Sequence, residues 1–287
     1  TNYAGTTLNK KLVIIGPGYF LSGANSNAGL QANPEQVNFG NLFIDSSASG
    51  SVLLGLAGVN IYNASALGYG ADNITISRCI INAISIYYSP AAGTIADNWN
   101  INKCYLGSFN GNIGIAQNWN VSNNIFTGYL DMSNAKNSGN VIRNNVFRSS
   151  INLYNAYFAN NIMVNTTITL TNCVVKNNLA NGNPAGFASY VGSNGNTSGH
   201  TDALLFQGLI GNSTDGQYRL ATGSPAIGAG LTVGTVVSPD AGAFGGPDPY
   251  RLSGIPPIPT IYSLTVPAAI PSGSSTMSVT LSSKNNN

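Results

Sequence analysis

Charged side chains are scarce in this 287-residue chain: Asp, Glu, Lys and Arg together make up only 7% of it, and there is a single histidine. Eleven basic residues against nine acidic ones give a net charge of +2. So small a charge supplies no electrostatic field that could hold the phosphates of nucleic acid or an anionic lipid surface. We therefore predict no nucleic-acid partner.

Long apolar runs are also missing. No stretch approaches the ~20 residues that a membrane-spanning helix needs, so we predict no membrane span. Three cysteines, few charges and abundant Asn, Ser, Thr and Gly favour an exported surface protein over a cytosolic enzyme. The hydrophobic content of 43% is too high for a disordered chain.

What the chain does contain is one short phrase, written six times between Asn73 and Asn181 at spacings of 16 to 25 residues. The clearest copies read NITISRCIIN, NWNINKCYLG and NWNVSNNIFTG. A repeat this short cannot bury its apolar face without a stacked neighbour, so it indicates a solenoid. Alignment of the copies gives one column of small residues, which comprises Cys79, Cys104, Asn124, Asn145, Asn161 and Asn178.

Apolar residues alternate with polar ones ahead of this column, as Ile76, Ile101 and Val121 show. Alternation of this kind predicts a strand with one buried face. A second apolar run follows the column, and a third comes after a turn, for example at Ile151–Leu153. Two or three strands per repeat predict an all-β chain folded as a single parallel β-helix of about eight to nine rungs.

The column itself predicts an asparagine ladder. An Asn side chain in a turn can bond the backbone of its own turn and the amide of the next rung. Cys79 and Cys104 would fill the same place in the first two rungs. Directly stacked rungs lie ~4.8 Å apart, which allows a disulfide by distance, whereas two buried free thiols avoid the unfavourable dihedral angle. Both alternatives stay open from the sequence.

The residue after each ladder position should point outward. These six apolar residues would form a stripe on the surface, which is a candidate interface: Ile80, Tyr105, Ile125, Val146, Ile162 and Leu179. Cover by the C-terminal tail, burial by the turn geometry and self-association are the alternatives. By the same alternation, the residues before the ladder column, beginning with Arg78 and Lys103, should face solvent.

Two later segments carry a resemblance to a known family. Residues 218–230 read YRLATGSPAIGAG, and residues 240–246 read DAGAFGG. Both resemble the closing rungs of secreted bacterial right-handed parallel β-helix proteins of the pectin-lyase-like class, and the opening NKKLVIIGPGYFL resembles an early rung of an uncharacterised subset. The resemblance implies a right-handed helix over residues 1–252, with an irregular loop at 183–202, closing rungs at 203–252 and a bacterial cell-surface or extracellular location. Relatives usually begin with a capping helix, so the first rung of this chain is expected to be open.

Proteins of that class are often polysaccharide lyases or hydrolases, which need calcium ligands with a basic residue, or carboxylates ~5 to 9.5 Å apart. The carboxylates here form no Asp-Asp or Asp-x-Asp pair, and we expect no two of them to share a column. His200 and Asp202 lie in the irregular loop without a third partner. Trp99 and Trp119 lie one rung apart and by alternation belong to the core rather than to a glycan-binding face. We therefore predict no catalytic residue, cofactor or metal.

The Pro-rich segment 253–287 should leave the solenoid as a connector and an extended tail with strands near Ile261–Pro267 and Met277–Ser282. It either returns along the solenoid as a strap, frays, or donates a strand to another molecule. Taken together, the sequence predicts a secreted, non-catalytic structural or adhesive surface protein that associates with itself or with other surface proteins. The alternative is an extracellular protein that binds or degrades polysaccharide, with glycans as partners.

Overall fold

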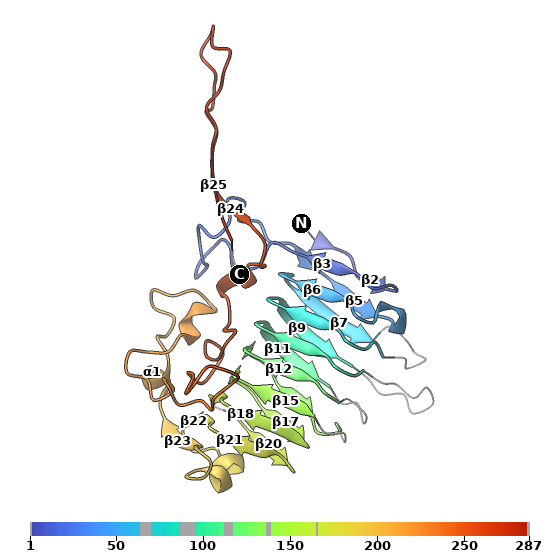
Figure 1. Ribbon diagram of the computed structural model, residues 1–287, viewed down its shortest axis with the longest axis vertical. Helices are drawn as coiled ribbons and strands as arrows, with labels where there is room; N and C mark the ends of the chain where they lie inside the picture. Colours follow the sequence, from blue (N-terminus) through green and yellow to red (C-terminus); the bar gives the residue numbers. More distant parts are fainter. Residues whose placement is uncertain are drawn as a thin grey trace.

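The computed structural model describes residues 2–63, 70–86, 96–111, 117–135, 139–164 and 166–285. Their main feature is a stack of short parallel strands, which forms the body of the molecule (Figure 1). One sheet has eight strands, and they lie side by side in the same order as in the chain. They are β3 (Val13–Ile15), β6 (Val52–Leu54), β8 (Thr75–Ser77), β10 (Asn100–Asn102), β12 (Asn120–Ser122), β15 (Asn140–Arg143), β18 (Ala156–Ala159) and β21 (Val174–Lys176).

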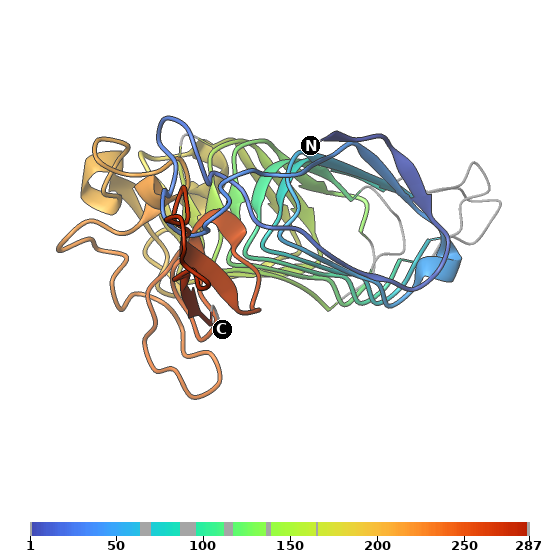
Figure 2. The ribbon, with the colours of Figure 1, turned by 90° about the horizontal axis from the view of Figure 1, so that it is seen from above.

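A second sheet forms the opposite wall of the coil. Its main path contains β2 (Thr6–Leu8), β5 (Asn41–Ile44), β7 (Val59–Asn63), β9 (Ile80–Ser85), β11 (Tyr105–Asn110), β13 (Ile125–Phe126), β16 (Val146–Phe147), β19 (Ile162–Met163), β22 (Leu179–Asn181) and β23 (Thr197–His200). A branch from β11 adds β14 (Leu130–Met132), β17 (Ile151–Tyr154) and β20 (Ile168–Thr171). The turns enclose a common interior when seen from above (Figure 2).

The predicted parallel β-helix is confirmed. The solenoid has about six turns, where the sequence predicts eight to nine rungs. The turns stack in register because like residues pair across neighbouring turns: Ile76 with Ile101, and Ile101 with Val121. Such pairing puts each apolar position directly over its equivalent, so one continuous core fills the coil. Short strands β1 (Asn2–Tyr3) and β4 (Asn38–Phe39) and the 3-10 helix η1 (Ser46–Ala48) flank the first turns.

The two tryptophans lie in this core, as predicted. Trp99 and Trp119 are fully buried, and their rings stack with centroids 4.9 Å apart and planes 3° from parallel. Each indole N–H donates to a buried backbone carbonyl, that of Ala71 or Ala96. A buried Trp needs such a partner, because an unpaired indole N–H would lose its bond to water.

The segment 183–252 differs from the expectation. Residues 183–202 are not an irregular loop, since they contain the 3-10 helix η3 (Ala185–Tyr190) and β23, which extends the second sheet. Residues 203–252 are not closing rungs, because none of their described residues joins a solenoid sheet. They hold α1 (Asp202–Leu205), η4 (Gly216–Tyr218), η5 (Leu252–Gly254) and long turns. The Gly, Pro and Ser residues of the quoted motifs favour turns, not strands. We call residues 203–255 the strap.

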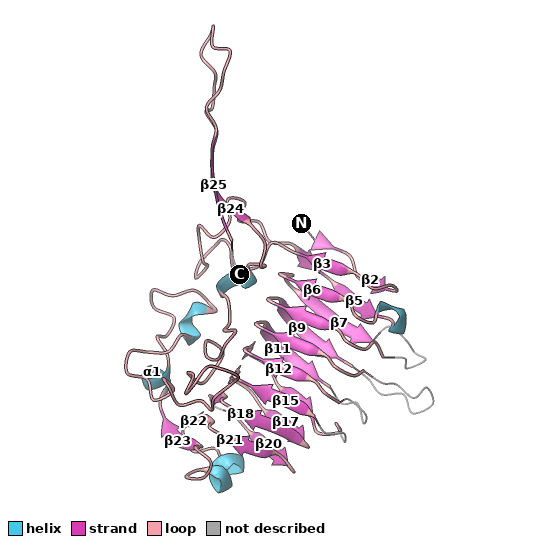
Figure 3. Ribbon diagram, in the orientation of Figure 1, coloured by secondary structure: helices cyan, strands magenta, loops and turns pink. Residues whose placement is uncertain are grey.

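The C-terminal tail does not return along the solenoid. Residues after 255 form a two-stranded antiparallel ribbon of β24 (Thr260–Thr265) and β25 (Thr280–Lys284), which projects from the end of the molecule near β3 (Figures 1 and 3). Its base is attached to the N-terminal loop through Ala32 N–H, which donates to Ile261 O at 2.8 Å. Within the described ranges, no helix is both long enough and apolar enough to cross a membrane.

Candidate functional site

The ladder column is a chain of buried amides. Asn124, Asn145, Asn161 and Asn178 are each completely buried. Every Oδ1 in this series accepts the backbone N–H of the preceding ladder residue; for example, Asn124 N–H donates to Asn145 Oδ1 at 2.9 Å. Every Nδ2 donates to the next Oδ1 at 3.0 or 3.1 Å. The series ends on Asn196, a member that the repeat did not reveal. It therefore satisfies polar groups that would otherwise be orphaned at each turn.

Cys79 and Cys104 continue the column as free, fully buried thiols, so the disulfide alternative does not hold in this structure. Cys104 Sγ lies 3.5 Å from the backbone N of Cys79, in the place that Oδ1 takes lower in the stack. Burial, followed by the hydrogen bond to Cys79, raises the pKa of the Cys104 thiol. Two neutral thiols in an apolar shell are structural fillers rather than nucleophiles.

A second column immediately precedes the ladder, and here the expectation of solvent exposure is wrong. Its first members, Arg78 and Lys103, are 4% and 7% exposed. Its six residues all have left-handed backbone, with φ between 50° and 57°: Arg78, Lys103, Asn123, Asn144, Asn160 and Asn177. The left-handed residue bends the chain between a strand of one sheet and the next strand, in the other sheet. The alternation of inward and outward side chains therefore cannot be counted through it. Asn tolerates this conformation better than Arg or Lys does.

The buried side chains of the second column hold the strap. Arg78 Nη1 donates to Ile255 O at 2.6 Å, and Lys103 forms an ion pair with Asp248. The Asn side chains follow, each donating from Nδ2 to a strap carbonyl: Asn123 to Gly245 at 2.7 Å, Asn144 to Asp240 at 3.2 Å, Asn160 to Leu231 at 3.2 Å and Asn177 to Ala229 at 2.7 Å. As the column descends turn by turn, the strap residue number falls. The strap therefore runs back along the whole stack.

The strap also covers the predicted stripe. Ile125, Val146, Ile162 and Leu179 are at most 2% exposed, and Ile80 and Tyr105 are partly buried. A Cβ on Gly242, which has φ of 84°, would lie only 2.7 Å from Ile162 Cδ1, and the left-handed backbone also favours glycine there. The stripe is thus an intramolecular contact. It is not an exposed interface, and its cover is the strap, not the C-terminal tail.

A buried carboxylate joins the strap to the N-terminal loop. Asp215 is completely buried and accepts hydrogen bonds from Asn27 Nδ2 at 2.9 Å, Ser213 Oγ at 2.8 Å and Ser253 N–H at 2.7 Å. The Tyr250 hydroxyl lies 3.3 Å from its other oxygen and 2.5 Å from the Tyr19 hydroxyl. Four partners from three segments compensate the burial of this charge. The cluster fixes the strap at the upper end of the stack.

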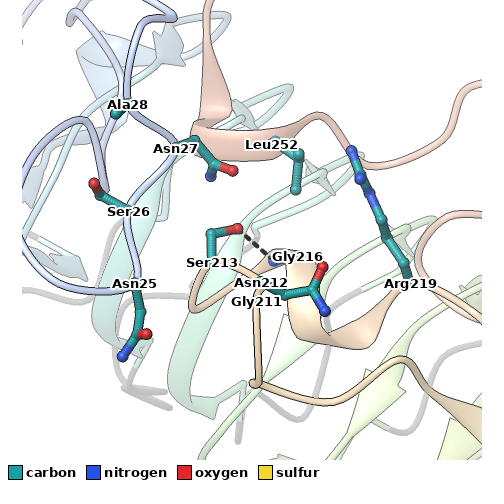
Figure 4. Close-up of a pocket in the computed structure, with 10 residues that line it drawn as sticks. All are labelled: Asn25, Ser26, Asn27, Ala28, Gly211, Asn212, Ser213, Gly216, Arg219 and Leu252. Atoms are coloured by element: carbon teal, nitrogen blue, oxygen red, sulfur yellow. Dashed lines mark hydrogen bonds between the residues drawn. The ribbon is translucent and has the colours of Figure 1, made fainter.

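A polar cleft of about 460 Å³ opens beside this cluster (Figure 4). Its walls come from the N-terminal loop, with Asn25, Ser26 and Asn27, and from the strap, with Asn212, Ser213 and Arg219. Asn27 and Ser213 are already bonded to Asp215. The cleft can offer amide, hydroxyl and guanidinium groups to a polar ligand. Asp215 does not line it, but its carboxylate holds the two walls together through Asn27 and Ser213.

The other titratable groups do not converge. The expectation that no two carboxylates share a column is wrong, because Asp97 N–H donates to Asp72 Oδ1 at 2.8 Å one turn away. Gln117 in turn bonds Asp97 at 2.9 Å, so this stack is a surface counterpart of the ladder. His200 bonds Thr197, whereas Asp202 bonds Asn181 and lies 3.9 Å from Arg148. The described residues contain no group of three or more His, Cys, Asp or Glu that could hold a metal.

Exposed apolar residues gather instead on the ribbon. Leu264, Val266, Val279 and Leu281 are each 49–54% exposed, although a sheet in a folded protein usually buries at least one face. No family model, curated protein or solved structure matches this chain. The features of the molecule that bear on its function are the ladder, the strap, the cleft and the ribbon.

Proposed function

We propose that this protein is a secreted, non-catalytic structural or adhesive component of a cell surface, which assembles through its C-terminal ribbon. The single observation that supports assembly is the ribbon, which projects away from the solenoid (Figure 1) and whose apolar residues have about half of their surface exposed. An exposed two-stranded sheet offers both edges and faces to another chain.

The body of the molecule suits a load-bearing role. Amides that are completely buried and bonded in series link each turn to the next, and the strap ties six successive turns from outside. Uncharged amides and hydroxyls solvate the surface without a large net charge. This composition and the resemblance to secreted bacterial β-helix proteins of the pectin-lyase-like class support an extracellular location.

Negative-stain electron microscopy of the full chain and of a chain ending at Gly254 tests the proposal. We expect assemblies from the full chain and separate short rods from the shortened one, because the strap contacts up to Gly254 stay with the solenoid. Separate rods from both samples over the whole accessible concentration range would refute assembly through the ribbon.

A second candidate function, polysaccharide binding, is favoured by one observation. A small pocket of about 140 Å³ lies on the eight-stranded sheet where it meets the strap, lined by Asn102, Asn120, Arg143 and Asp248 among others. Amides with one cation and one anion can bond sugar hydroxyls and carboxylates. A glycan array probed with the full chain and with Arg143→Ala is the test, and equal signals from both would reject this pocket as the binding site.

A further inference from the structure

The ribbon has one apolar face and one polar face. Leu264 lies directly opposite Leu281, and the next pair along is Thr265 with Thr280. Directly opposed residues share a face and successive residues alternate. Continuation of the same register places Val266 opposite Val279, beside the two leucines. The opposite face carries the threonine pair and the pair Ser263–Ser282.

Nothing among the described residues covers the apolar face, since its four aliphatic side chains are all about half exposed. Isolated two-stranded ribbons are marginal in water, and stable ones have a third strand or a packed face. This ribbon therefore needs a partner that presents a flat apolar surface of similar size. The base is held in place, because Thr260 is buried and Ala32 bonds Ile261.

We propose that the partner is the same ribbon of a second copy, packed face to face through Leu264, Val266, Val279 and Leu281. This inference rests on the proposed function and names the contact that would produce assembly. Two sheets packed in this way lie ~10 Å apart with interdigitated side chains. The contact is self-complementary, as a two-fold dimer requires.

Charge and area both favour a second copy. Residues 252–283 contain no charged side chain, so two ribbons can approach without repulsion or the desolvation of a charge. Lys284, the first charge, lies 5.3 Å from the Tyr262 ring of its own ribbon. Four half-exposed aliphatic side chains on each ribbon can bury less than the ~1,200 Å² of a standard interface, which suits a weak, reversible dimer.

Matched lysine substitutions in the full chain test the proposal. Leu264→Lys with Leu281→Lys charges the apolar face, and Thr265→Lys with Thr280→Lys puts the same charge on the polar face of the same paired positions. Sedimentation velocity over a concentration series measures the dimer. We expect the wild-type chain and the threonine variant to dimerise, and the leucine variant to dimerise at least ~100-fold more weakly, because buried lysines would meet their symmetry mates.

The outcomes separate the two proposals. If both variants dimerise as the wild type does, face-to-face packing is overturned, while assembly through strand edges or through the solenoid ends still stands. If both lose the dimer equally, the apolar face is not specific and the inference fails. If the wild-type chain remains monomeric throughout, the inference and the proposed assembly function fail together. Circular dichroism confirms that the solenoid is intact in each variant.

Discussion

Asn145→Ala is the most direct perturbation of the ladder. The Asn145 side chain makes five hydrogen-bond contacts. Its Oδ1 accepts from Asn124 N–H and Nδ2 at 2.9 and 3.1 Å, and the two hydrogens of its Nδ2 are shared among Val121 O, Arg143 O and Asn161 Oδ1 at 2.9 to 3.0 Å. All of them are removed from solvent, since the residue is fully buried. Alanine leaves each partner without this bond in a site that water does not reach.

Each buried bond lost in this way costs about 1 kcal/mol, so the five together predict a destabilisation on the order of 3 to 5 kcal/mol. Asn100→Ala is the matched control, because Asn100 also lies in the stack but is only partly buried and accepts one ladder-like bond, from Asn120 at 2.9 Å. Its cost should be about 0.5 to 1 kcal/mol.

Urea denaturation followed by tryptophan fluorescence provides the assay, since Trp99 and Trp119 lie in the core of the same stack. We expect the midpoint of Asn145→Ala to fall well below that of Asn100→Ala, with the far-ultraviolet circular dichroism of both folded proteins unchanged. Equal midpoints would refute the reasoning, because they would show that the amide series carries no more stability than a surface bond.

Three further predictions concern the columns and the tyrosine cluster. Asn160→Gly should keep the left-handed turn but lose both bonds to Leu231, whereas Asn160→Ala should cost about 1 to 2 kcal/mol more; thermal melts measure the difference, and equal melts would contradict it. Cys104→Asn should stabilise the chain by up to about 1 kcal/mol, because its Sγ already lies near the carbonyls of Ile76 and Asn102; a lower urea midpoint would contradict this. Burial, and after it nearby groups that include Asp215, raises the pKa of Tyr19 and Tyr250 in the folded protein. Above pH ~10 the unfolded chain loses these protons more readily than the folded protein, so the free energy of unfolding should be unaffected by them below that pH and fall as the pH rises further. Replacement of both tyrosines by phenylalanine should flatten that decline in alkaline melts.

The repeated phrase made the solenoid and the ladder predictable, because period-two alternation and a recurring buried amide each have one structural meaning. The second column was wrongly predicted to face solvent. Arg78 and its equivalents have left-handed backbone, and the alternation of inward and outward side chains cannot be continued through such a residue. The four Asn residues in that column were a usable signal, since Asn favours positive φ. The strap could not be found in this way. Apart from the Asp248 side chain, the strap groups that the second column contacts are backbone groups, as with Gly245 and Ala229, and these leave no trace in residue identity.

The direction of the strap decides how the molecule would respond to a pulling force. The ribbon leaves the strap at Ile255, which is bonded to Arg78 near the top of the stack. Tension on the ribbon would load that bond first, then the bonds of Ser253 and Tyr250 to Asp215, then the Lys103–Asp248 pair, and then each asparagine below it in turn. Bonds broken one at a time yield at low force and dissipate energy over a long extension. A contact made through the ribbon would therefore be tethered by a segment that unzips and lengthens before the asparagine ladder itself is strained.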